Sequence, residues 1–284
     1  MNIPEWAIVW LSLAALVLFG VRIWMEGVSR TAEGKERGKR RKRGYEMGAS
    51  KTIGDREIQE DEYGICEGQE GTMAVLADGM GRHYGGRIAS RIAVETFLEV
   101  FEEGNAFYNP QYSFRRAFQG ANRRILNKME EEQGSASVGA VMVRDCKLYY
   151  AAAGNVKVAV YRNGELVPVS AGHTISVLAR QKYEEGKLTR QEAVSLLTEH
   201  RLYNYVGQDG FRDIEFFDKP IRLYGGEYVV LMTDGLYETA RWKDLEDCLE
   251  GEGSCQEKAY SMIELVNKSE AEGKDNGAVV LIRC

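Results

Sequence analysis

The chain is poor in cysteine and lacks any paired cysteine motif. Its 284 residues include an odd number of cysteines, five, and none stand in a C-x-x-C spacing: Cys66, Cys146, Cys248, Cys255 and Cys284. Scattered thiols of this kind argue against a disulfide framework and against a zinc site. They favour a reducing compartment.

Most of the chain also lacks an excess of basic residues. Residues 1–50 contain nine Lys/Arg and five Asp/Glu, and the whole chain has a net charge of -6, so residues 51–284 carry -10. A protein that binds nucleic acid needs a basic face. The acidic body therefore argues against nucleic acid as a partner.

Charge is absent from one N-terminal stretch, Trp6–Val21. Because about 20 apolar residues cross a bilayer, residues 4–25 predict a transmembrane helix. Trp6, Trp10 and Trp24 stand towards its ends, where indole rings prefer the headgroup region. A cleaved signal peptide is the alternative, but no Lys or Arg precedes the apolar run and no clean cleavage site follows it.

A basic segment, "RTAEGKERGKRRKRG", follows the predicted span. The positive-inside rule places what comes after it in the cytoplasm. The segment can contact anionic membrane lipid, or it can be a solvated linker, and both interpretations stay open. We therefore expect a single-pass protein of the cell membrane, with a transmembrane anchor in residues 1–28, a basic juxtamembrane linker in residues 29–50, and a globular domain in residues 51–284.

Strand signals dominate from residue 51 onward. Short segments rich in β-branched and aromatic residues predict strands: "EYGICEG", "TMAVLAD", "ASVGAVMV", "KLYYAAAG", "VKVAVYR", "ELVPVS", "DIEFFDKP", "YVVLMTD" and "GAVVLIRC". The "RNGE" between two of them predicts a hairpin turn of the Asn-Gly kind.

Helical periodicity appears in four places. Apolar residues recur at helical spacing over residues 84–103 and 112–132, and a final helix is expected over about 254–272. Residues 174–197 predict two short helices, the second with a capping box between Thr189 and Glu192. Because strands do not alternate regularly with helices, the pattern indicates an α+β fold of antiparallel sheets covered by helices.

Acidic residues gather where apolar runs meet glycine or asparagine. Asp78 and Asp234 each follow such a run and precede glycine, in "VLADGMG" and "VVLMTDG". Asp-Gly is a common turn dipeptide, but glycine also allows backbone to approach an ion closely. Asp275 precedes the last predicted strand, and "REIQED" precedes the first. Mg²⁺ and Mn²⁺ prefer such oxygen ligands, and two ions that share a carboxylate can activate water and bind a phosphoryl oxygen.

The order of the motifs is typical of one family. "REIQED", "LADGMG", "AAAGNVKVAVYRNGEL", "AGHTISVLARQKYEEGKLTRQEA", "LMTDGLYE" and "DNGAVVL" follow one another. From about residue 51 to its C-terminus the chain resembles the metal-dependent Ser/Thr protein phosphatases of type 2C in their bacterial form. The resemblance implies a four-layer α-β-β-α sandwich of two antiparallel sheets flanked by helices. It also implies hydrolysis of phosphoserine and phosphothreonine, with two Mn²⁺ or Mg²⁺ ions, on phosphorylated proteins, and a Ser/Thr kinase and its substrates as partners.

The resemblance also implies a role for each acidic motif. Asp78 would bridge both ions and serve catalysis, and the Gly79 carbonyl would hold one of them. The remaining expected metal ligands are Asp234, Asp275, Glu60 and Asp61, the last two directly or through water.

Two further residues have implied roles outside the ligand set. Arg56 would grip the substrate phosphate through charge-assisted hydrogen bonds and so act in catalysis. Asn276 would support Asp275 without binding metal.

The chain departs from the family pattern in several motifs. "GNVK" stands where the family has Gly-Asp-Ser-Arg, so Asn155 replaces an aspartate associated with a third ion, and a neutral amide is a poorer ligand for a hard cation. The third site is therefore left open. "SASVGA" replaces the usual Gly-Thr-Thr, Arg82 replaces a glycine, and Met80 stands where some relatives place a general acid. These departures keep an alternative open: a degenerate phosphatase domain that binds phosphoproteins or a partner without turnover.

Overall fold

The computed structural model describes residues 44–284, except for residues 69, 129–132 and 199. The predicted span at residues 4–25 lies outside the described residues. Within the described part of the chain, none of the helices combines the length and the apolar character needed to cross a bilayer. The folded unit begins at Tyr45, six residues before the boundary expected at residue 51, because an unpredicted strand opens it.

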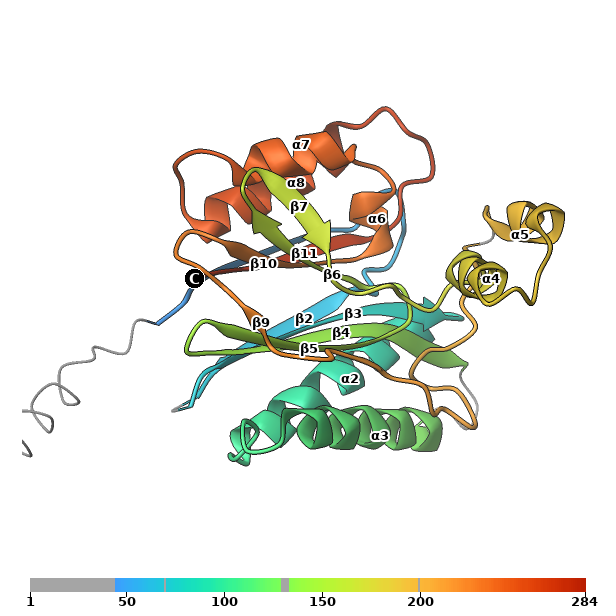
Figure 1. The fold of residues 1–284 in the computed structure, drawn as a ribbon, viewed down its shortest axis with the longest axis horizontal. Helices are drawn as coiled ribbons and strands as arrows, with labels where there is room; N and C mark the ends of the chain where they lie inside the picture. The colour runs from blue at the N-terminus through green and yellow to red at the C-terminus, as the bar shows by residue number, and fades with distance from the viewer. Residues whose placement is uncertain (1–43, 69, 129–132, 199) are drawn as a thin grey trace, which may run out of the picture. The chain divides into compact units, whose positions relative to one another are not determined.

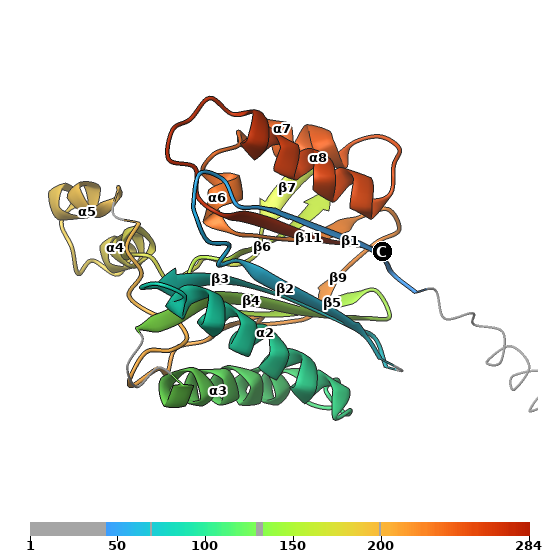
Figure 2. The ribbon, with the colours of Figure 1, turned by 180° about the vertical axis from the view of Figure 1, so that it is seen from behind.

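Two antiparallel sheets form the centre of this unit (Figures 1 and 2). The first sheet has the strand order β1 (Glu46–Thr52), β11 (Gly277–Arg283), β10 (Tyr228–Met232), β6 (Lys157–Arg162) and β7 (Glu165–Pro168). The second has the order β2 (Glu62–Glu67), β3 (Thr72–Gly81), β4 (Gly134–Arg144), β5 (Lys147–Ala153) and β8 (Glu215–Phe216), and β9 (Ile221–Arg222) also pairs with β5. The expectation of antiparallel sheets is confirmed.

Helices cover both outer faces, so the unit has the four layers that the resemblance implied (Figures 1 and 2). The second sheet is covered by α2 (Gly85–Glu102) and α3 (Pro110–Lys128), and the first by α7 (Trp242–Leu249) and α8 (Cys255–Lys268). Three further helices lie at the end of the sandwich where β3 finishes: α4 (Ile175–Glu184), α5 (Arg190–Leu196) and α6 (Asp234–Tyr237).

The core lies on both faces of the first sheet. Along β11, Val280 and Ile282 pack into the larger hydrophobic cluster between the sheets. Val279 and Leu281 point the other way, into the cluster beneath α7 and α8. Because successive strand residues face opposite sides, an uninterrupted apolar run is what a strand buried on both faces requires. This explains why "GAVVLIR" shows no polar alternation.

Turn and cap chemistry in the sequence is confirmed locally. Asn163 and Gly164 have φ values of 53° and 84°, as the predicted Asn-Gly hairpin requires. Thr189 and Glu192 form the predicted capping box at the start of α5. Ser254 and Glu257 form a second box at α8, in an S-x-x-E pattern that could have predicted that start.

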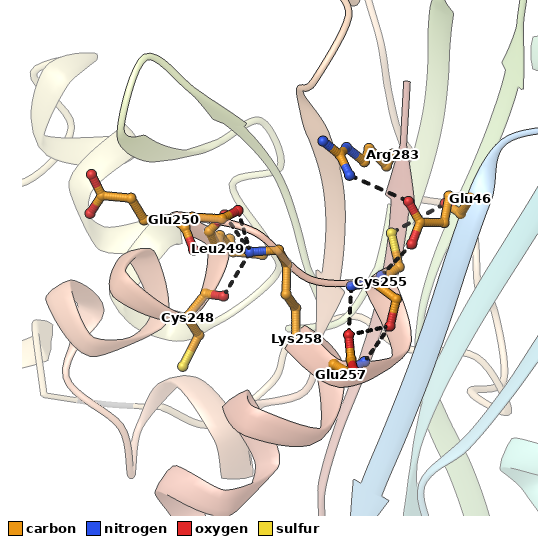
Figure 3. A network of polar contacts seen from close by, with 10 residues as sticks. Glu46, Cys248, Leu249, Glu250, Cys255, Glu257, Lys258 and Arg283 are labelled. Atoms are coloured by element: carbon orange, nitrogen blue, oxygen red, sulfur yellow. Dashed lines mark hydrogen bonds and ion pairs between the residues drawn. The ribbon is translucent and has the colours of Figure 1, made fainter.

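The strand β1 was missed because its stability comes from distant partners. Glu46 accepts a hydrogen bond at 2.8 Å from the Cys255 backbone N–H, at the start of α8, and lies 3.5 Å from Arg283 (Figure 3). Nearby, the buried Lys258 ammonium donates to the carbonyls of Leu249, Glu250 and Gly251 at 3.0–3.1 Å, beyond the end of α7. The contacts of Glu46 join segments about 200 residues apart, which a local pattern cannot report.

Candidate active site

Asp78 lies inside a strand, so its Asp-Gly pair is not a turn and does not end the strand as the sequence suggested. The strand β3 continues to Gly81, and Asp78 and Gly79 stand opposite Ser137 and Ala136 of β4. A Cβ on Gly79 would lie 2.2 Å from the carbonyl oxygen of Gly86, in the first turn of α2. Glycine is needed here because two backbone segments touch.

The second Asp-Gly pair begins a helix. The strand β10 ends at Met232, Thr233 is the N-cap residue, and Asp234 is the first residue of α6. A Cβ on Gly235 would lie 1.9 Å from the carbonyl oxygen of Asn276. The two glycines therefore serve the same purpose, close approach of backbone, in two different secondary structures.

Asp61 is buried next to these strand ends. The Thr233 hydroxyl donates to Asp61 Oδ2 at 2.8 Å and accepts from the Ala278 N–H at 2.8 Å. Asp61 Oδ1 is buried without a hydrogen-bond partner among the described residues. Burial, together with the negative charges of Asp234 and Asp275, raises the pKa of Asp61 to about 8. Thr233 was missed by sequence reasoning, although it directly precedes Asp234.

Glu60 carries a second unpartnered carboxylate oxygen. Its Oε1 is buried with no hydrogen-bond partner in the described part of the chain, and it lies 2.3 Å from where a Cβ of Gly86 would be. Burial raises the pKa of Glu60, and the charge of Asp275 adds to that rise. The Glu60 backbone N–H donates to Asn276 Oδ1 at 2.7 Å. Asn276 also donates to the carbonyl of Ile53 at 2.8 Å and so joins two loops.

Arg56 is held at the open side of the site. Its Nη2 donates to Asp275 Oδ2 at 2.7 Å, and both side chains are about half exposed. The other Asp275 oxygen accepts the backbone N–H of Asn276 at 2.8 Å. Arg56 belongs to the loop between β1 and β2, and Asp275 to the loop before β11. A guanidinium carries five N–H donors, so donors remain for a bound anion.

Asn155 contacts the site through Asp234. Its Nδ2 donates to Asp234 Oδ2 at 2.7 Å, and its Oδ1 is buried without a partner among the described residues. The pKa of Asp234 is raised to about 6, mainly by burial and also by the charges of Glu238 and Asp275, although the hydrogen bond from Asn155 opposes the rise. The Asn155 carbonyl accepts from the Tyr237 hydroxyl at 3.0 Å.

Five acidic side chains therefore form one carboxylate cluster: Glu60, Asp61, Asp78, Asp234 and Asp275. Burial raises the pKa of Asp78 well above its usual range, and the other four carboxylates raise it further. Anions held this close repel one another unless a cation lies between them. The cluster thus stores a repulsion that a bound cation would remove.

The donor set of the cluster suits a hydrated metal ion better than one held by protein alone. Across residues 44–284, with the gaps given above, no three His, Cys, Asp or Glu side chains are grouped as a metal ion held by protein alone would need. Mg²⁺ keeps several waters and uses only one or two carboxylates at a time. Unpartnered oxygens on Glu60 and Asp61, together with the buried Asp78 whose pKa responds to both of them and to Asp234, fit hydrated hard cations of that kind.

The structure also shows the contacts of residues that depart from the family pattern. Arg82 is exposed, and its backbone N–H donates to the Gln133 carbonyl at 3.1 Å. The neighbouring His83, which is not one of these departures, is exposed and has a φ of 55°. Ser137, in the altered "SASVGA" motif, accepts the Asn155 N–H at 3.3 Å. Two of the departures, Ser137 and Asn155, therefore contact each other.

Comparison with known proteins identifies the family. A model of the family described as protein phosphatase 2C matches residues 48–272. The serine/threonine phosphatase stp of Listeria welshimeri is 25% identical over 236 residues, which cover 80% of this chain and 90% of the relative. The S. agalactiae serine/threonine phosphatase structure has a TM-score of 0.74 at 24% identity, covering 84% of this chain and 99% of that one.

A second solved structure, the catalytic domain of PstP in complex with two manganese ions, has a TM-score of 0.63 at 22% identity and covers 84% of this chain and 97% of that one. The two solved structures share the two-sheet fold of this chain, and the family match spans most of the chain. The chain therefore belongs to the protein phosphatase 2C family, and it is a phosphatase of that type.

Proposed function

We propose that this protein is a membrane-anchored phosphatase that hydrolyses phosphoserine and phosphothreonine in proteins and depends on Mn²⁺ or Mg²⁺. The observation that carries the proposal is the carboxylate cluster, with its two buried unpartnered oxygens beside an accessible guanidinium. The names of the relatives support the substrate class, and the two manganese ions of the PstP structure support the metal.

Six groups would hold two ions: the carboxylates of Glu60, Asp61, Asp78, Asp234 and Asp275, and the carbonyl of Gly79. When bound, such ions lower the pKa of a water molecule and neutralise phosphate oxygens. The chain's own part is to hold the carboxylates ionised and in place. Thr233 does this for Asp61 and Asn155 for Asp234, each by donating a hydrogen bond to the carboxylate.

Arg56 would bind the phosphate of the substrate. Its guanidinium is oriented by Asp275 and is about half exposed, so it can bind an arriving anion without changing its position. Arg matches the planar arrangement of phosphate oxygens in a way that a lysine does not. Asp275 thus serves twice, as an expected metal ligand and as the residue that positions Arg56.

The test is phosphate release from a phosphothreonine peptide as a function of Mn²⁺ concentration. We expect no turnover in excess chelator and recovery with added Mn²⁺ or Mg²⁺. Arg56→Ala should raise KM about tenfold because it removes a charge-assisted contact. Arg82→Ala is the matched control, since that side chain is exposed. Full activity in chelator, or equal effects of the two substitutions, would contradict the proposal.

The anchor is proposed from the sequence of residues 4–25 and the basic segment after it. Protease added to intact cells should spare the domain, and it should cleave the domain once the membrane is opened. Cleavage while the membrane is sealed would show the opposite orientation. In the cytoplasm, the expected partners are phosphorylated proteins and a Ser/Thr kinase with its substrates.

The non-catalytic alternative predicts phosphopeptide binding with no release of phosphate under any metal. It rests on Asn155 and on the altered "SASVGA" motif. The relatives found are named as phosphatases, which favours the catalytic reading. The metal titration separates the two readings directly.

A further inference from the structure

Two cysteines from opposite sheets meet at the end of the sandwich far from the carboxylate cluster. The sulfur atoms of Cys146 and Cys284 are 2.8 Å apart. A disulfide bond is about 2.0 Å long, so the two thiols need less than about 1 Å of movement to reach bonding distance. Cys146 belongs to the hairpin between β4 and β5, and Cys284 directly follows β11.

Cysteine is an unusual residue at the turn position that Cys146 occupies. Arg144 pairs with Lys147, so Asp145 and Cys146 form a two-residue loop, and their φ values are 49° and 54°. Such a loop favours Asp-Gly or Asn-Gly, because glycine takes a positive φ without a steric penalty. The hairpin at Asn163 follows that preference and this one does not. A cysteine at a glycine position indicates that its side chain is used.

The backbone around both sulfurs is fixed by hydrogen bonds. The Cys146 N–H donates to the Tyr45 hydroxyl at 3.2 Å, and the Cys146 carbonyl accepts from Leu223 at 2.8 Å. The Cys284 N–H donates to the Glu227 carbonyl at 2.9 Å, and its carbonyl accepts from Gly226 at 2.8 Å. Cys146 is exposed and Cys284 is partly buried. One sulfur is thus open to a reagent and the other lies behind it.

We propose that Cys146 and Cys284 are a redox pair, which forms a reversible disulfide by exchange with a low-molecular-weight disulfide. The Cys146 thiolate attacks one sulfur of the reagent, forms a mixed disulfide and releases one small thiolate. The Cys284 thiolate then attacks the Cys146 sulfur and releases the second. The two cysteines are oxidised, the reagent is reduced to two thiols, and these take up the two cysteine protons.

The bond would join the two sheets without touching the active site. The strand β11 starts at Gly277, beside the carboxylate cluster, and ends at Arg283. At about 3.3 Å per residue, Cys284 lies about 23 Å along the strand from that start. Oxidation should therefore stabilise the domain rather than change its chemistry. Under reducing conditions the pair stays as two thiols.

The order of the two steps follows from the environment of each sulfur. Burial, together with the neighbouring Cys146, raises the pKa of the Cys284 thiol to about 12. Because the thiolate is the attacking species, closure by Cys284 should accelerate as pH increases from about 7 to about 9.

The test equilibrates the purified full chain with mixtures of glutathione and glutathione disulfide. We expect the chain to lose two hydrogens in mass, and a digest to yield a peptide pair joined through Cys146 and Cys284. Cys284→Ser, Cys146→Ser and Cys146→Gly should abolish this product, the last being suited to a positive φ. Cys66→Ser is the control, since Cys66 is also partly accessible and should leave the product unchanged.

Thermal unfolding, measured on the same samples, shows whether the disulfide stabilises the domain by joining the two sheets. Oxidation should raise Tm by roughly 5–15 °C, and a reducing agent should reverse the rise, in wild type and in Cys66→Ser alike. The proposal is overturned if both cysteines still react with maleimide at the most oxidising ratio, or if the reaction stops at one glutathione on Cys146. Formation of the same product in Cys284→Ser, or a bond without any rise in Tm, would overturn it as well.

Discussion

The two Asp-Gly pairs look alike in the sequence and differ in the structure. Asp78–Gly79 is part of an extended strand that runs on to Gly81, whereas Asp234–Gly235 is the first turn of a helix. Both aspartates nevertheless reach the same carboxylate cluster. In both places a side chain on the glycine would strike a carbonyl oxygen, that of Gly86 or that of Asn276. The shared pattern therefore reports close packing of backbone around a site and not a turn.

The largest effect on activity is expected from removing the negative charge of either aspartate, Asp78 or Asp234. Asp78→Asn and Asp234→Asn should each lower phosphopeptide turnover at least about 100-fold, because loss of a ligand costs more than loss of its support. Initial rates at saturating Mn²⁺ measure this. If one substitution were silent, the two Asp-Gly pairs would not serve one site.

The next largest effect is the loss of stability expected when the glycine of either pair, Gly79 or Gly235, is replaced. Gly79→Ala and Gly235→Ala should each destabilise the domain by about 3 kcal/mol, because the new Cβ would overlap a backbone oxygen that cannot move freely. Gly225→Ala is the matched control: its Cβ would meet nothing within 4 Å, and we expect a change below about 0.5 kcal/mol. Denaturant unfolding of the three variants, with equal m-values, gives the comparison. If Gly79→Ala were as stable as wild type, Gly79 would not be needed for close backbone packing, and the interpretation of Asp-Gly as a simple turn pair would be favoured again.

Stability against pH should reveal the cost of ionising Asp61, which is buried and also lies near the charges of Asp234 and Asp275. The usual pKa of Asp61, 3.8, is raised to about 8 in the fold. The unfolded chain then releases this proton near pH 4 and the folded chain only near pH 8, so the metal-free protein should lose stability as pH rises between these values. Below that window the effect is absent, and above it the loss is complete.

Thermal unfolding in chelator from pH 4 to pH 8 checks this, with Asp61→Asn as the comparison that should flatten the curve. Saturating Mn²⁺ should oppose the decline because binding favours ionised carboxylates. A Tm that rises steadily with pH in chelator would mean that the cluster is not repulsive.

The smallest effect is expected at Asn155, which touches only one of the two aspartates. Its amide donates to Asp234 Oδ2 at 2.7 Å, so Asn155→Asp exchanges a hydrogen bond for a second negative charge. In chelator the variant should lose about 1–3 kcal/mol of stability. With metal it should respond at a lower Mn²⁺ concentration, because an added carboxylate binds a hard cation better than an amide. The readouts are Tm and initial rate across one Mn²⁺ series.

An Asn155→Asp variant that is unchanged in both readouts would show that this position contributes nothing to metal binding. A variant that loses stability equally with and without Mn²⁺ would show that the amide is purely structural. The distinction matters because the sequence alone suggests only that a ligand has been lost, whereas the structure shows that the amide has a bond of its own.

The sequence could predict the elements whose cause is local. The Asn163–Gly164 hairpin and the Thr189–Glu192 capping box depend on residues within three positions of each other, and both are confirmed. The apolar run of β11 was recognised for the same reason. The strand β1 was not, since "EMGASKT" has little strand character and is stabilised by β11 and α8 from the far end of the chain.

From the sequence alone one can read which residues carry charge beside glycine, and the order of the motifs is enough to indicate the family and the two-sheet fold. The folded chain was needed to show what those glycines are for, that Thr233 secures Asp61, and that Cys146 lies against Cys284. The physical reason is the same in each case. These contacts join segments separated by up to 172 residues, and such distances close only when both sheets have formed.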